Sequence, residues 1–218
     1  MGHLTLLLLL AAFGAALIAL AQTNLRRMLA FSSISHVGLV VLGIAPLNQQ
    51  GIQGALFQLF NFTLVAGGLF LVTGFLHQRT GNTELSGLGG AARSMPLLAS
   101  FFLLLGLAAL GLPGTSGFPA ELLLILSALD SHTGAGLAAL FGMILGAGYF
   151  LGIYPKAFFG PVRNSVVAEA KDLRRRELLV LVVLALLVLG FGLYPQWVLD
   201  FTRAAGEGWV ARLGIAGA

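Results

Sequence analysis

Residues 96–129 read PLLASFFLLLGLAALGLPGTSGFPAELLLILSAL, an apolar stretch that is interrupted near its centre. A membrane helix needs about 20 mostly apolar residues to cross a hydrocarbon core of roughly 30 Å, so this stretch is too long for one straight crossing and too short for two comfortable ones. The interruption, at 113–119, contains two prolines and two glycines: Pro113, Gly114, Gly117 and Pro119. Because proline removes a backbone donor and clashes with the preceding turn, the stretch predicts one discontinuous helix.

The rest of the chain is equally apolar. It is 58% hydrophobic and 9% charged, with a mean hydropathy of +0.96, whereas about a quarter of the residues of a typical soluble domain are charged. These values predict an all-α, polytopic membrane helix bundle of about six transmembrane helices, forming a single membrane domain over residues 1–218. The other expected spans are residues 4–21, 28–45, 52–76, 134–154 and 178–193, followed by an interfacial tail over 195–218. The first span ends in a sequence that a signal peptidase could cleave, but no basic residue precedes it, so we expect a retained helix.

Composition also excludes several classes of function. The chain has no cysteine, and its four histidines are scattered, so we expect no metal site and no cofactor. The net charge of +4 comes from arginines and lysines between apolar runs, which is typical of loops that orient helices rather than of nucleic-acid binding. Phosphate-binding loops and nucleophile–base motifs are missing from the sequence. We therefore expect neither catalytic residues for bond-making chemistry nor a redox centre in this chain.

Loop charges give an expected topology. If residues 96–129 cross once, the chain crosses six times and both termini lie on one side. All of the 12 basic residues except Arg203 and Arg212 then lie on the other side, in the loops that follow the first, third and fifth spans. Two crossings in this stretch would split the basic loops between the two sides. The positive-inside rule therefore predicts a multi-pass protein of the cytoplasmic (inner) membrane with both termini outside.

Glu121 is the only carboxylate inside an apolar run, and it follows the interruption directly. A charged side chain at membrane depth costs at least about 2.5–3.5 kcal/mol on insertion scales, so its default interpretation is functional. A carboxyl group that takes and releases a proton beside a broken helix is suited to proton transfer. The alternative is that Glu121 caps the second half-helix near the membrane surface, where a helix N-terminus stabilises an anion.

Other polar residues lie in the apolar spans. His36 follows Ser32, Ser33 and Ser35, and such a strip of hydroxyl groups with an imidazole could conduct protons through water or could join two helices. Gln58 and Asn61 lie one turn apart in the third span, with the same two interpretations. Lys156, at the end of the fifth span, is expected to extend to the interface, with an ion pair to a buried acid as the alternative.

Two motifs carry a resemblance to a known family. Residues 21–38, AQTNLRRMLAFSSISHVG, and residues 112–121, LPGTSGFPAE, resemble the antiporter-like subunits of respiratory complex I, most strongly those of the chain-M (subunit 4) type. These subunits are related to the large subunits of Mrp-type cation/proton antiporters. Tyr194 and Pro195, after the last span, also fit the pattern. The likeness extends over nearly the whole chain.

The resemblance has specific implications. Such subunits have about fourteen helices with two inverted repeats of five, and this chain resembles the last six helices, the second-repeat half. Glu121 then matches the carboxylate associated with proton exchange toward the outside, and His36 matches a histidine of the central polar axis. Phe62 stands where the family usually has a histidine or lysine, so the connection between His36 and Glu121 is in question. The first repeat has no counterpart here, which fits a split gene, a truncated copy or a degenerate copy.

The leading hypothesis is a proton-translocating subunit or half-subunit of a complex I-type NADH:quinone oxidoreductase or a related ion-translocating assembly. Its expected partners are the lipid bilayer, protons or Na⁺, and other membrane subunits, including a chain that supplies the first repeat; nucleic acid is not among them. Ser32, Ser35, Gln58 and Asn61 would position water near Glu121 and His36. The alternatives are a structural membrane subunit without transport and an Mrp-like or inorganic-carbon-coupled transporter subunit.

Overall fold

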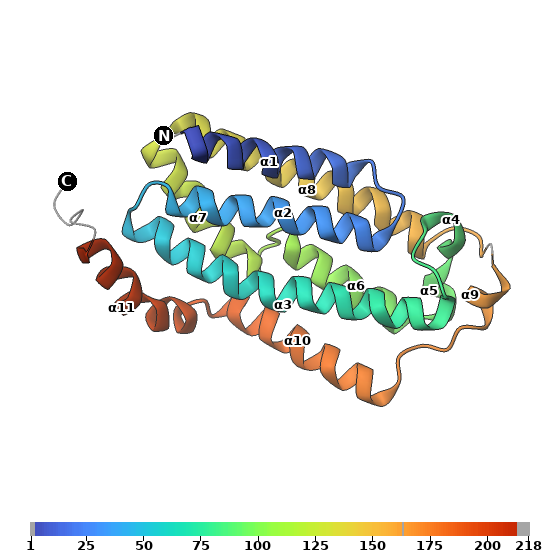
Figure 1. The fold of residues 1–218 in the computed structure, drawn as a ribbon. Coiled ribbons are helices and arrows are strands. Elements are labelled where there is room, and N and C mark those ends of the chain that lie inside the picture. The colour runs from blue at the N-terminus through green and yellow to red at the C-terminus, as the bar shows by residue number, and fades with distance from the viewer. Residues whose placement is uncertain (1–2, 163, 213–218) are drawn as a thin grey trace.

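The helices of the chain lie side by side in an elongated bundle (Figure 1). The computed structural model describes residues 3–162 and 164–212. The long helices are α1 (His3–Leu20), α2 (Leu25–Ile44), α3 (Gln49–Thr80), α6 (Pro96–Ala109), α7 (Gly117–Ser131), α8 (Thr133–Phe158), α10 (Arg175–Leu193) and α11 (Gln196–Arg212). The short helices α4 (Leu85–Leu88), α5 (Ala91–Ser94) and α9 (Ser165–Glu169) lie in the connections. By length and composition, α2, α3, α8 and α10 could each cross a membrane. The expected all-α membrane architecture is confirmed.

Capping residues set where the helices begin and end. The Asn24 side chain accepts a hydrogen bond from the Arg26 amide at 2.9 Å, so α2 begins three residues before the predicted span. Asn48 caps α3 in the same way, with the Gly51 amide at 2.7 Å. At the other end of α3, Gly81 adopts a left-handed conformation with φ of 68° and ends the helix. Both helices are therefore longer than apolar periodicity alone suggests.

The predicted interruption is present, but it lies a few residues earlier than expected. Helix α6 ends at Ala109 and α7 already begins at Gly117, so residues 110–116 form the break. The prediction that Gly117 and Pro119 belong to the break was wrong. Both lie in the first turn of α7, where proline is tolerated because its missing N–H would have no partner inside the helix.

The two ends of the bundle differ in character. The start of α1 and the end of α11 lie at one end, and α4, α5 and α9 lie at the other, together with the connections that follow α1, α3 and α8 (Figure 1). Helices α6 and α7 follow one another along the bundle, so the broken pair takes the place of one long helix (Figure 1). Hydrogen bonds join the connections at the far end, among them Asn24 Nδ2 to Glu84 Oε1 at 2.8 Å and Ser94 Oγ to the Val167 carbonyl at 2.6 Å.

Arg79 ties the long connection after α8 to the end of α3. Its guanidinium donates to the carbonyl oxygen of Lys171 at 2.8 Å and pairs with the Glu177 carboxylate, and both charged groups are largely buried. Removing one partner of such a pair leaves the other charge buried without compensation. We therefore expect Arg79→Met to loosen the connection and to make trypsin cleave several-fold faster between residues 159 and 174.

Arg203→Met is the control for this experiment, because Arg203 pairs with Asp200 at 3.1 Å with both side chains 56% exposed. An exposed pair of this kind contributes little stability. Equal cleavage rates in the Arg79→Met variant and the unmodified chain would show that the connection is held by other contacts.

The final helix begins against the bundle rather than apart from it. Val198 is buried in a cluster with Phe57 and Ala120, whereas Trp197 and Phe201 are exposed. The exposed aromatic side chains fit the prediction that the tail lies at the membrane interface. Residues 213–218 of the predicted tail lie outside the described residues.

Candidate proton-transfer site

The break leaves a backbone acceptor free inside the bundle. In a continuous helix the carbonyl oxygen of Ala109 would accept from the N–H of the residue four positions later, which is Pro113 and has no N–H. The Ala109 carbonyl instead lies 3.0 Å from Nε2 of His36 on α2. Pro113 therefore ends α6 and also leaves the Ala109 carbonyl oxygen free for the contact that joins the break to α2.

Glu121 lies in the second turn of α7, and α7 begins inside the bundle. Its side chain is 3% exposed, so the carboxyl group is enclosed by the bundle. Its Oε1 lies 4.0 Å from His36 Nε2. Gly111, with φ of 65°, provides the room for this carboxyl group, because a Cβ at that position would overlap Oε2. The break thus provides the space that the carboxyl group of Glu121 occupies.

The contacts of His36 constrain where its protons lie. Nδ1 is 2.8 Å from the carbonyl oxygen of Ser32, and Nε2 is 3.0 Å from that of Ala109. Carbonyl oxygens only accept, so both contacts are hydrogen bonds only when the ring carries two protons, and a neutral ring makes one of them. The imidazolium form would have the Glu121 carboxyl group beside it to balance its charge. This arrangement can gain or lose a proton while retaining one hydrogen bond.

Two small cavities meet at His36. The first lies toward α8, has a volume of about 20 Å³, and is lined by His36, Glu121, Ser35 and Tyr149. The second lies toward α3, also has a volume of about 20 Å³, and is lined by Ser32, His36, Asn61 and Phe62. Each is large enough for about one water molecule. His36 is therefore the titratable side chain that lines both cavities.

Phe62 lies against His36, with the ring centroids 6.1 Å apart. An aromatic hydrocarbon side chain cannot accept or donate a proton, so it contributes no relay group on the α3 side. The residue before Phe62 is Asn61, and its amide is a polar group that lines the same cavity. A proton that reaches His36 from this side therefore passes through water or through the hydroxyl groups of Ser32 and Ser33, which line the same cavity.

Gln58 and Asn61 connect α3 to the break. Asn61 Oδ1 accepts a hydrogen bond from Ser116 Oγ at 2.7 Å, and Asn61 Nδ2 donates to Gln58 Oε1 at 3.4 Å. Gln58 lies beside the Glu121 carboxyl group. Among the described residues, Gln58 Nε2 and Glu121 Oε2 are buried without a hydrogen-bond partner, which marks the carboxyl group as a place where a further proton or donor can be accommodated.

The break is also held from its other side. The Ser116 amide donates to the carbonyl oxygen of Val188 on α10 at 2.9 Å. Gly192, one turn further along α10, allows this approach, since a Cβ there would overlap backbone atoms of Thr115 and Gly114. The break is thus fixed between α3 and α10, while Glu121 faces α2.

The structure places most of the predicted residues together. Glu121, His36, Ser32, Ser35, Gln58 and Asn61 surround the break, and Lys156 lies apart from them at the end of α8. Within residues 3–162 and 164–212, no ion pair includes Lys156. Three residues of the site were missed by sequence reasoning: Gly111, Tyr149 and Gly192. The described residues contain no group of three or more side chains that could hold a metal ion.

A membrane helix bundle with a broken helix, a buried carboxyl group beside the break and an imidazole facing it defines the antiporter-like class of membrane subunits. The family described as NADH:quinone oxidoreductase/Mrp antiporter, TM, matches residues 2–146. The chain belongs to this family, as the two sequence motifs predicted.

Known relatives show the same affiliation. Subunit M of NADH-quinone oxidoreductase from Rickettsia typhi is 40% identical over 184 residues, which is 84% of this chain and 37% of the relative. Chain 4 of the NAD(P)H-quinone oxidoreductase of a Synechococcus species is 41% identical over 190 residues, or 83% of this chain and 36% of the relative. The chain therefore spans less than half the length of these relatives.

Solved structures agree in fold. A chain of respiratory complex I from Thermus thermophilus superimposes with a TM-score of 0.88 and 32% identity, covering 95% of this chain and 44% of that one. A chain of the Mrp complex from Dietzia reaches a TM-score of 0.83 at 23% identity, covering 94% of this chain and 46% of that one. The second likeness concerns the fold alone.

Proposed function

We propose that this chain is the second-repeat half of a proton-translocating, antiporter-like subunit in a complex I-type or related assembly of the inner membrane. The observation that carries this proposal is the contact between His36 and Glu121 at the broken helix, at 4.0 Å. An acid and a base at this separation, buried at membrane depth, are costly to retain without a function. Proton transfer is the chemistry that both groups have in common.

The proposed step is a proton exchange between His36 and Glu121. His36 receives a proton from the α3 side, through the cavity that Ser32 and Asn61 line, and passes it from Nε2 to the carboxyl group. When Nε2 loses its proton, its hydrogen bond to the Ala109 carbonyl is lost as well. The protonation state of His36 and the position of the break are thereby linked, and motion of the break can direct the Glu121 proton toward the outside.

The α3-side cavity also supports the proposed partner. It is lined by polar groups of Ser32, Ser33, His36 and Asn61, yet Phe70, which lines the same cavity, is exposed at the bundle surface. Polar groups at membrane depth face protein or a water-filled cavity and not lipid. The proposed neighbour is a membrane chain that supplies the first repeat, with a protonatable side chain to replace the one that Phe62 does not provide. Both termini would then lie outside, because the basic connections lie at the opposite end of the bundle.

The proposal is tested by replacing His36 with glutamine, which can keep one hydrogen bond to a carbonyl oxygen but cannot carry a proton. We expect proton uptake by NADH-energised inverted membrane vesicles, followed with a pH-sensitive dye, to fall about tenfold or more. His77→Gln, the same change near the end of α3, should leave uptake unchanged. Normal uptake in the His36→Gln variant would remove His36 from the proton path.

A structural subunit without transport is the second candidate, and the observation that favours it is the packing of Phe62 on His36. The two functions differ in their partners. Gentle purification of the tagged chain from its own membrane should recover a first-repeat chain and quinone-reducing subunits if the chain translocates protons. Recovery with other membrane subunits but without a first-repeat chain would favour the structural role.

A further inference from the structure

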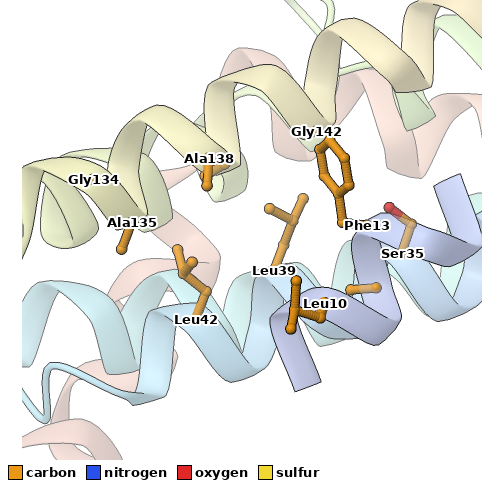
Figure 2. Close-up of a pocket in the computed structure, with 12 residues that line it drawn as sticks. Leu10, Phe13, Ser35, Leu39, Leu42, Gly134, Ala135, Ala138 and Gly142 are labelled. Carbon is orange, nitrogen blue, oxygen red and sulfur yellow. The ribbon is translucent and has the colours of Figure 1, made fainter. Parts of the chain in front are cut away.

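An apolar cavity lies on a different side of the bundle from the proposed partner surface. It has a volume of about 460 Å³ and lies between α1, α2 and α8. Leu10 and Phe13 from α1 and Leu39 and Leu42 from α2 border it, while α8 contributes mainly small residues (Figure 2). Gly134, Ala135, Ala138 and Gly142 leave the surface of α8 hollow over two turns, and among the described lining residues Ser35 is the one with a polar side chain.

We infer that this cavity binds one acyl chain of a membrane phospholipid. Water is a poor occupant, because cavities without polar partners stay dry. A transmembrane helix of another protein is too wide: helices with their side chains are about 10–12 Å across, so a cavity of this volume would hold roughly one turn. A single flexible hydrocarbon chain can follow the groove and restore the packing contacts that an empty cavity lacks.

The position of the cavity along the bundle also fits a lipid. From Gly134 to Gly142 it extends about 12 Å along α8, at 1.5 Å per residue. This is close to the depth of one leaflet, which is half of the roughly 30 Å hydrocarbon core. The cavity starts at the first turn of α8, at the end of the bundle, and stops near its middle, as an acyl chain inserted from one side of the membrane would.

A second cavity continues from the first toward the end of the bundle. It has a volume of about 70 Å³, shares Leu42 and Ala135 with the apolar cavity, and is also lined by Ser131 and His132. The imidazole of His132 can donate a hydrogen bond to a phosphate or ester oxygen, whereas the Ser131 hydroxyl already donates to the Ser127 carbonyl at 3.0 Å. An apolar groove that leads to a polar opening matches an amphiphile whose head group lies at the membrane surface.

The site can be tested with a phospholipid that carries a photoreactive diazirine in its acyl chain. The lipid is added to native membranes, the assembly is extracted and washed with detergent, and labelled peptides are identified by mass spectrometry after illumination. We expect labelling of residues 134–142 of α8 to exceed that of the exposed face of α10. Labelling of the two helices to the same extent would overturn the inference, since it would indicate only bulk lipid.

Two variants make the test specific. Ala138→Phe places a ring in the groove and should reduce this labelling about tenfold or more, which corresponds to a loss of roughly 1.4 kcal/mol of binding. Gly134→Leu, at a position where a Cβ would meet no atom within 4 Å, should do the same if Ala138→Phe does not fold. Ala30→Phe, on an exposed part of α2 away from the groove, should have no effect. Full labelling in both groove variants would exclude the site.

Discussion

Replacing Glu121 with glutamine is expected to reduce NADH-driven proton uptake by inverted membrane vesicles about tenfold or more while the subunit still assembles. Glutamine has the shape of glutamate, so it fits the space beside Gly111 and can still meet Gln58 and the imidazole of His36. It cannot take up and release a proton. A neutral amide also removes an ionisable group from the membrane interior, which should leave the fold at least as stable as before.

Three measurements, on this variant and on two others, separate loss of transport from loss of structure. The amount of assembled complex, judged by co-purification of its partners, should equal that of the unmodified protein. Glu207→Gln, at an exposed position on α11, should retain full uptake and controls for the change in charge. Glu121→Asp keeps the proton but shortens the side chain, so its uptake should be intermediate. Unchanged uptake in Glu121→Gln would contradict the proposed role and favour a structural subunit.

The sequence was informative wherever the signal was local. Pro113 predicted the end of α6, because a missing N–H is a property of the residue itself, and Glu121 stood out as a carboxylate in an apolar run. The bounds of the break were less accurate. Proline is disfavoured in helix interiors, although α8 continues past Pro155, and it is tolerated in the first turn. Pro119 alone does not indicate which of these positions it occupies.

The geometry of the site could not be predicted from local signals. The 4.0 Å contact between His36 and Glu121 joins residues far apart in the chain, and only the resemblance to a family suggested that the two belong to one site. Gly192 is a sharper example. It lies two residues from Gly190 in the apolar part of α10, and nothing in the sequence distinguishes the two. They differ only in what each of them faces in the folded bundle.

That difference supports a second strong prediction. Gly192→Ala is expected to destabilise the protein and to reduce proton uptake, because the new Cβ would overlap backbone atoms of Thr115 and Gly114. Backbone cannot turn aside as a flexible side chain can, so α10 and the break must move apart. The hydrogen bond from the Ser116 amide to Val188, at 2.9 Å, would be stretched or lost, and overpacking of this kind typically costs about 1–3 kcal/mol.

Gly190→Ala is the matched control, since its Cβ would meet no atom within 4 Å. Alanine is favoured over glycine in a helix interior by about 0.5–1 kcal/mol, so this variant should unfold at an equal or higher temperature in detergent, whereas Gly192→Ala should unfold at a lower one. If the break positions Glu121, proton uptake should fall in Gly192→Ala even at temperatures where the variant is fully folded. A folded Gly192→Ala variant with normal uptake would show that the contact with α10 stabilises the bundle without controlling the proton-transfer site.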